Sequence, residues 1–446
     1  MPSASIPRQS RVPNTRMDAL SRATGIVGGF LLPLVAAALY RTYDVTVAPQ
    51  SLEITRQLGL VFLAGELGVV LYAGRRGHDV LATLRRLSTW AKIALTIFLA
   101  TFWISSVAVS QMAPFSIGLS IGWIVHLLFA ASLYHLAHNA PVIDARHVAT
   151  GFAAGLVMLT AFTVVQFARV PDALNGNGSS FVQNAGVDLG SAIPGFISSR
   201  LFGAWCGAVL ALTTGVAWQA RETGALHRSC AMVALAFGLV IWTATRAAVL
   251  GWVVILPIAW VLAGRPQMRA FHRRLPLYLL AAGVIALLLP PYDTPQFSFF
   301  RNEGLSSANG FSSGRLMLWE TALRVAAGYP MLGSGAGSSW WLVSLDGFYH
   351  VQPHNAVVQF LLNWGLIPTI AALTLLLGAT WRAHRIARAQ HDLLPFILML
   401  DCLLVMSLLD GMLHFAQFVM LIFGCLAICL SRHAPLSALP RQSATA

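Results

Sequence analysis

Long apolar runs recur through the whole sequence, and each is about as long as a helix that crosses a lipid bilayer. A membrane-spanning helix needs roughly 17–25 apolar residues. Only 10% of the residues are charged, whereas soluble domains carry about 25%. The chain is therefore predicted to be an all-α integral membrane protein with about 12 transmembrane helices. The runs lie at residues 24–40, 55–74, 89–109, 116–137, 148–167, 200–219, 230–246, 247–263, 275–290, 355–378, 395–410 and 411–431.

Residues 230–263 form an apolar stretch that is too long for one crossing. At 1.5 Å per residue, a single helix of this length would reach about 51 Å, against a hydrocarbon thickness of about 30 Å. We therefore predict a turn near Thr243–Ala247. This turn would place Arg246 at a membrane surface.

The basic residues are distributed unevenly between the two sides of the predicted bundle. If the N-terminus is cytoplasmic, all but eight of the 29 Lys and Arg residues fall in cytoplasmic connectors, tails or helix ends. This orientation satisfies the positive-inside rule, and the opposite one violates it. The net charge of +13 thus reflects membrane topology, and no nucleic-acid partner is expected. The eight residues on the outer side are Arg41, Arg56, Arg169, Arg200, Arg246, Arg301, Arg315 and Arg324.

No internal repeat or soluble domain is visible, so residues 1–446 are predicted to form a single polytopic membrane domain. Residues 24–40 also fit a signal peptide, because Ala36-Ala37-Ala38 resembles a cleavage site. Cleavage there would leave the remaining topology unchanged. Two outer connectors are longer than usual loops, at about 168–199 and 291–354. The second is polar and rich in Gly, Ser and aromatic residues, so we expect the chemistry to lie there.

The large outer loop contains a helical pattern that begins after Ser312-Ser313-Gly314. Apolar residues recur there at helical spacing, at Leu316, Trp319, Leu323 and Ala326. Gly328-Tyr329-Pro330 should end the helix. We predict an amphipathic helix at the membrane surface with Arg315 in its first turn. A cation there opposes the helix dipole, unless the helix start and the guanidinium bind an anion together.

A glycine-rich segment follows this helix, at residues 333–339. A phosphate-binding loop would need a preceding strand and a terminal Gly-Lys-Ser/Thr, and neither is present. A flexible hinge is the favoured interpretation.

Two more outer arginines, Arg200 and Arg246, lie at helix ends within apolar sequence. A deeply placed arginine costs about 2.5–3.5 kcal/mol on insertion scales, so it usually has a partner or a purpose. One alternative for each of the three arginines is a side chain that simply reaches to the membrane surface. Together with Arg315, however, they place three guanidinium groups toward one compartment, which favours a shared phosphate ligand.

His354 is the strongest candidate for a catalytic side chain. It follows Pro353 and precedes Asn355 at the entry to a membrane helix on the outer face. The rigid helix start, the adjacent amide and the outer arginines distinguish it from the other histidines. An imidazole there is suited to act as a general base near neutral pH.

No metal-binding pattern is present. The outer acidic residues are scattered without an Asp-x-Asp pair, and the five cysteines lie in apolar segments without zinc-type spacing. The cysteines are expected to be small buried side chains. We expect no cofactor and no metal, with arginine in place of magnesium as the counter-charge for a diphosphate.

The sequence around these residues resembles the O-antigen ligase and polymerase superfamily of bacterial inner-membrane glycosyltransferases. The helix count and the large outer loop extend the likeness to the whole chain, but the motifs do not separate ligase from polymerase. The matching motifs are Thr243-Ala244-Thr245-Arg246-Ala247, Ser313-Gly314-Arg315-Leu316 with Trp319, Gly328-Tyr329-Pro330-Met331-Leu332-Gly333-Ser334-Gly335, and His354-Asn355 with Gln359 and Asn363-Trp364-Gly365-Leu366-Ile367.

This resemblance implies a GT-C-like enzyme of the bacterial inner membrane whose active site, including the loop 291–354, faces the periplasm. Its donor would be a polysaccharide on undecaprenyl diphosphate, and a ligase would use lipid A–core as acceptor. His354 would deprotonate the acceptor hydroxyl, supported by Asn355. Arg246 and Arg315 would bind the diphosphate in a metal-independent, inverting transfer. Arg200 joins this set, although family members often show Asn-rich sequence near the start of that helix.

Two alternatives to an O-antigen ligase remain open. A repeat-unit polymerase of the same superfamily would use the same donor but transfer the glycan to another repeat. A transporter for polysaccharide or lipid would belong to a different class. Its support would be the carboxylates Glu66, Asp401 and Asp410 within apolar segments. We expect Glu66 and Asp401 to pair with neighbouring helices instead.

Overall fold

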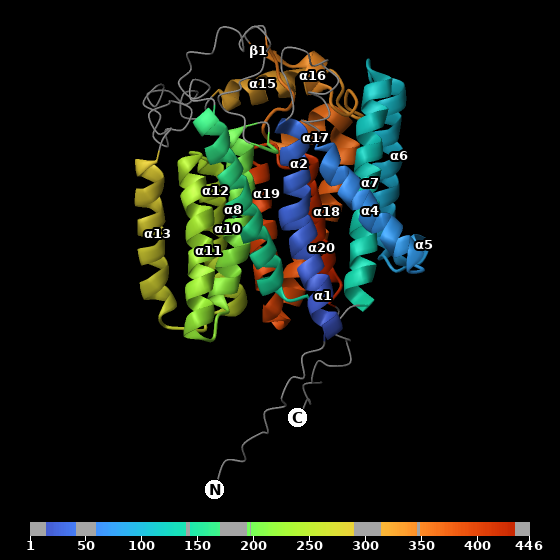
Figure 1. Cartoon of the computed structure of the whole chain (residues 1–446). Helices are drawn as coiled ribbons and strands as arrows, with labels where there is room; N and C mark the ends of the chain where they lie inside the picture. The colour runs from blue at the N-terminus through green and yellow to red at the C-terminus, as the bar shows by residue number, and fades with distance from the viewer. Residues whose placement is uncertain are drawn as a thin grey trace, which may run out of the picture.

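The apolar runs of the sequence fold into long helices that stand side by side (Figure 1). The structure is a computed structural model, and it describes residues 15–41, 59–139, 143–169, 194–196, 198–289, 314–345 and 348–432. The helices up to residue 288 are α1 (Thr15–Thr24), η1 (Gly25–Leu31), α2 (Leu32–Arg41), α4 (Leu60–Arg75), α5 (Val80–Arg85), α6 (Thr89–Ile104), η2 (Ser105–Val109), α7 (Ala113–Asn139), α8 (Ala145–Arg169), α10 (Ser199–Trp218), α11 (Thr223–Trp242), α12 (Arg246–Ala263) and α13 (Phe271–Leu288). The later elements are α15 (Arg315–Ala326), α16 (Ser339–Leu342), β1 (Ser344–Leu345), β2 (Phe348–Tyr349), α17 (Ala356–Trp364), α18 (Leu366–Ala389), η6 (His391–Leu393), α19 (Leu394–Ser407) and α20 (Ala416–Leu430).

Nine helical segments of the described residues are long and apolar enough to cross a membrane. Helices α4, α19 and α20 are apolar too, but have only 16, 14 and 15 residues. The strands β1 and β2 form a small antiparallel hairpin of two residues each. The prediction of a helical membrane protein is therefore confirmed, whereas the number of about 12 crossings stays a prediction.

The apolar stretch 230–263 is broken where its length requires a break. Helix α11 ends at Trp242 and α12 begins at Arg246. The intervening Ala244 has a φ of +52°, in the left-handed region. This confirms the predicted turn.

The bundle has two different ends (Figure 1). Helices α15 and α16 lie across one end, and α1 begins at the opposite end. We call the first the α15 end. The described part of the predicted outer loop, from residue 314 on, thus lies at the end away from the start of α1. Residues 170–193 and 290–313, which hold parts of both long connectors and include Arg301, lie outside the described residues, as does Arg56.

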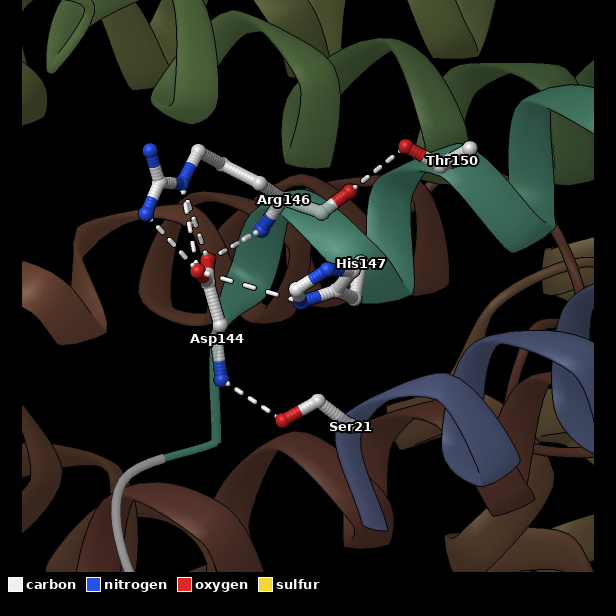
Figure 2. A network of polar contacts seen from close by, with 5 residues as sticks. All are labelled: Ser21, Asp144, Arg146, His147 and Thr150. Atoms are coloured by element: carbon white, nitrogen blue, oxygen red, sulfur yellow. Dashed lines mark hydrogen bonds and ion pairs between the residues drawn. The ribbon is translucent and has the colours of Figure 1, made fainter. Parts of the chain in front are cut away.

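A polar network fixes the start of α8 (Figure 2), beside α1 at the end opposite α15 (Figure 1). Asp144 Oδ1 accepts a hydrogen bond from the Arg146 amide at 2.9 Å, and Arg146 Nη2 lies 2.8 Å from Asp144 Oδ2. The Asp144 amide donates to Ser21 Oγ of α1 at 2.8 Å. Burial opposes ionisation of Asp144, but the hydrogen bonds and charge of Arg146 lower its pKa. This network therefore caps α8 and joins it to α1.

Helix α15 has the predicted bounds and packs one side against the protein. Its buried residues are Leu318, Ala322 and Ala326, which form a small core with Leu362 of α17. Leu316 and Leu323 of the predicted stripe are instead 42% and 43% exposed. Ala326 of the same stripe belongs to the small core and Trp319 packs against it, so the stripe is partly buried against the protein and partly exposed.

The glycine-rich segment 333–339 is packed tightly, so the predicted hinge is wrong. All its residues are buried, and Ser334 and Gly335 donate their amides to Leu362 O and Asn363 O, both at 2.9 Å. Gly335 has a φ of +95°, and a Cβ there would lie 2.6 Å from Ser110 Oγ. The absence of a side chain thus permits close packing against α17 and the segment after η2.

Candidate functional site

His354 is held in an unusual backbone conformation at the start of α17. Its φ is +55°, which residues with a Cβ seldom adopt. Asn355, the next residue, caps the helix, since its Oδ1 accepts from the amides of Val357 and Val358 at 2.9 and 3.1 Å. Strain of this kind persists only where the surroundings fix it, and it concentrates at functional sites.

The same asparagine connects α17 to the turn between α19 and α20. Asn355 Nδ2 donates to Leu408 O at 2.9 Å. This contact brings residues 408–415 beside His354. The predicted supporting residue is thus a bridge between two parts of the chain.

Asp410 lies in that turn and contacts His354 directly. Its Oδ1 lies 2.7 Å from His354 Nδ1 and accepts the Gly411 amide at 2.9 Å. The Asp410 side chain is 5% exposed, whereas 30% of the His354 side chain is exposed. One imidazole nitrogen is therefore held by a buried carboxylate, while part of the ring remains open to the surroundings.

Arg315 approaches the same carboxylate from α15. Its Nη2 lies 3.5 Å from Asp410 Oδ2. Gly314, with a φ of +76°, provides the left-handed residue before this helix, which has no side-chain cap. Asp410 therefore joins Arg315 and His354, two predicted site residues that are far apart in the sequence.

The charge of Asp410 is stabilised in this cluster. Burial alone would raise the pKa of the Asp410 carboxyl, but the hydrogen bond from His354 and the charges of His354 and Arg315 hold it well below its usual range. Because the folded-state pKa is depressed, the resulting stabilisation is complete above the ordinary carboxyl range and is lost only in strong acid. Asp410 is thus an anion at any physiological pH, and it orients the proton-bearing nitrogen of His354 toward itself.

A second histidine, His414, lies close enough to feel the charge of the first. His414 Nδ1 is 3.1 Å from Nε2 of Gln359 on α17. Burial lowers the pKa of His414 to about 4, and the charge of nearby His354 acts in the same direction. His414 is therefore neutral near pH 7 and does not compete with His354 for the Asp410 charge.

Arg200 and Arg246 lie at the same end of the bundle. Arg200 is in the first turn of α10 and Arg246 is the first residue of α12. About two turns along α10 from Arg200, a Cβ at Gly207 would lie 2.6 Å from Ala248 Cβ and 3.4 Å from Sδ of Met406 in α19. The starts of α10 and α12 therefore adjoin the end of α19, which leads into Asp410. Both arginines are half-buried.

Sequence reasoning missed Asp410 as a site residue because it ends the apolar run 395–410. Its place within apolar sequence instead groups it with Glu66 and Asp401 as support for a transporter. Those two do pair with neighbouring helices, as predicted: Glu66 Oε2 lies 2.6 Å from His126 Nδ1, and Asp401 Oδ2 lies 2.9 Å from His384 Nε2. The available signal for Asp410 was the following Gly411, which is typical of a turn.

The cluster combines a base with cations. An imidazole held by a carboxylate through Nδ1 presents Nε2 as a proton acceptor, and nearby guanidinium groups can bind phosphate. Within the described residues, no group of three or more His, Cys, Asp or Glu side chains could hold a metal ion. The five cysteines are free and buried, as predicted.

Fold and site together define a multi-pass helical membrane protein with a histidine–carboxylate–arginine cluster at one end. Residues 231–373 match the family model of the O-antigen ligases. This part of the chain, from α11 into α18, is similar to the O-antigen ligases, which confirms the resemblance seen in the motifs. It contains Arg246, Arg315 and His354, while Arg200 and Asp410 lie outside it. No curated protein matches the chain.

Proposed function

We propose that the protein is an O-antigen ligase, which transfers polysaccharide from undecaprenyl diphosphate to a sugar hydroxyl of lipid A–core. The observation that carries this proposal is the cluster in which Asp410 contacts both His354 and Arg315. It combines a positioned base with a cation suited to a diphosphate. The superfamily match supplies the class of substrate.

In the proposed reaction, His354 is the general base. Asp410 accepts the Nδ1 proton, so Nε2 removes the proton from the acceptor hydroxyl. The hydroxyl oxygen forms a bond to the anomeric carbon while the bond from that carbon to the diphosphate oxygen breaks, which inverts the configuration. The proton on Nε2 then passes to solvent.

Arginines stabilise the departing diphosphate in this scheme. Arg315 is linked to the base through their shared carboxylate, Asp410. Arg246 and Arg200 supply further positive charge from the starts of α12 and α10. Charge placed where negative charge develops lowers the barrier of such a transfer. The counter-charge therefore comes from the chain itself, and we propose a metal-independent reaction.

The same reasoning proposes an inner-membrane protein whose active site faces the periplasm. The α15 end lies away from the start of α1, and most basic residues belong to connectors of the other end. The positive-inside rule makes that other end cytoplasmic. A lipid-linked polysaccharide exposed at the outer leaflet would meet the site there.

A repeat-unit polymerase is the second candidate, because the family match covers motifs that both activities share. A transporter is less well supported. The three carboxylates that would support it each contact a histidine, and Glu66 and Asp401 each form an ion pair of their own, away from the Asp410 cluster. In these pairs each buried carboxylate has a partner on a neighbouring helix, which accounts for it without a transport path.

The decisive experiment is gel analysis of lipopolysaccharide from a strain that lacks the gene. A ligase predicts core without any polymer and accumulation of long lipid-linked polymer. Core capped by one repeat unit would indicate a polymerase instead. Complementation with His354→Ala or Arg246→Ala protein should fail, and normal decoration of core by either variant would refute the mechanism.

A further inference from the structure

The turn between α11 and α12 places a strained residue just before Arg246. Ala244 has a φ of +52°. The Arg246 amide donates to Ala244 O at 3.0 Å, and α12 begins at Arg246. The conformation of this turn therefore determines where α12 starts and where Arg246 is placed.

Thr245 precedes α12 but does not cap it with its side chain. A threonine in this position usually accepts a hydrogen bond from a first-turn amide. The Thr245 hydroxyl instead lies 2.9 Å from that of Thr243. Thr243 donates its single hydroxyl proton to a carbonyl of α11, Leu239 O at 2.9 Å. Thr245 must therefore be the donor to Thr243.

Both hydroxyls are packed against Gly203 of α10. A Cβ at Gly203 would overlap the hydroxyl oxygens of Thr243 and Thr245 and would lie 2.7 Å from Thr245 Cβ. Thr243 is fully buried, and Thr245 nearly so. The bare backbone of Gly203 thus forms a notch that accommodates the hydroxyl pair and allows α12 to approach α10.

We propose that the Thr243–Thr245 hydroxyl pair and the Gly203 notch are positioning elements that fix Arg246 for binding the diphosphate of the lipid-linked donor. A strained turn persists only where its surroundings over-determine it. The hydroxyl pair ties the turn to α11, and the notch holds it against α10. The inference rests on the proposed function, in which Arg246 binds the diphosphate.

The test measures equilibrium binding of undecaprenyl diphosphate to the full-length protein in detergent. Thr245→Val keeps the side-chain shape without the hydroxyl, and Thr245→Ser keeps the hydroxyl. We expect Thr245→Val to weaken binding about tenfold, because a hydrogen bond that orients a charged group is lost. Thr245→Ser should bind within about twofold of wild type.

The notch has a matched control in α11. Gly203→Ala places a methyl group against both hydroxyls, whereas a Cβ at Gly224 has nothing within 4 Å. Gly203→Ala should weaken binding, and Gly224→Ala should not. If Gly203→Ala protein does not fold, the Thr245 variants still decide the question.

A double-mutant cycle separates positioning from a general structural effect. If Thr245 acts through Arg246, the effect of Thr245→Val should vanish in an Arg246→Gln background. An equal loss in both backgrounds, or no loss in wild type, overturns the inference. If Arg246→Gln alone binds as tightly as wild type, the diphosphate role of Arg246 fails, and with it this inference.

Discussion

Asp410, in the turn between α19 and α20, contacts His354 at the start of α17: Asp410 Oδ1 lies 2.7 Å from His354 Nδ1. The carboxylate fixes which imidazole nitrogen carries the proton. Asp410→Asn keeps the shape but can donate to Nδ1, which favours the wrong tautomer. We expect turnover of the lipid-linked donor to fall by about 10²-fold or more, as for other carboxylates that orient a catalytic histidine. The measurement is transfer to lipid A–core by purified protein.

Asp144 provides the control for this substitution. It is a half-buried carboxylate in an ion pair (Figure 2), but it lies beside α1 at the opposite end of the bundle (Figure 1). Asp144→Asn retains an oxygen that can cap α8, so turnover should stay within about twofold. An equal loss of turnover in both variants would show that the Asp410 effect is not specific to the site.

Stability below neutral pH should depend on His414. Its folded-state pKa is about 4, against a value of 6.5 for an unperturbed histidine. Between these values the unfolded chain binds more protons, so the free energy of unfolding rises with pH. At pH 5 the penalty from this residue is about 2 kcal/mol relative to pH 7.5. Thermal unfolding at the two pH values should therefore show a smaller loss in His414→Gln than in wild type, and equal losses would contradict the prediction.

The packed glycine segment should tolerate no side chain at Gly335. Its φ of +95° and the nearby Ser110 and Ser116 hydroxyls leave no room for a methyl group. We expect Gly335→Ala to cost about 2 kcal/mol or more of unfolding free energy. In α4, a Cβ at Gly68 has nothing within 4 Å, so Gly68→Ala should leave the melting temperature unchanged. A similar melting temperature for both variants would support the hinge instead.

Transfer should continue in the presence of EDTA, because arginines provide the proposed counter-charge for the diphosphate. The assay compares turnover before and after chelation. Loss of activity that added magnesium restores would refute this prediction. Arg315→Ala should abolish activity with or without the chelator.

The helical architecture follows from the sequence because apolar length and basic asymmetry are local, additive signals. The turn before Arg246 and the bounds of α15 are predicted for the same reason. The buried side of α15 is not, since Leu316 and Leu318 are equally apolar and only tertiary packing selects one. The role of Asp410 in the site is not predicted, because its partner His354 is 56 residues away in the sequence. Nothing in a single sequence shows that pairing.

The turn that carries Asp410 also has a consequence for biosynthesis. Ribosomes make a chain from its N-terminus, so Arg315 and His354 are synthesised and inserted before the carboxylate that joins them. The cluster cannot assemble until α19 has brought Asp410 to the α15 end. A nascent chain that stalls before α19 is inserted therefore lacks the carboxylate that holds His354, and the proposed transfer requires that insertion has passed α19.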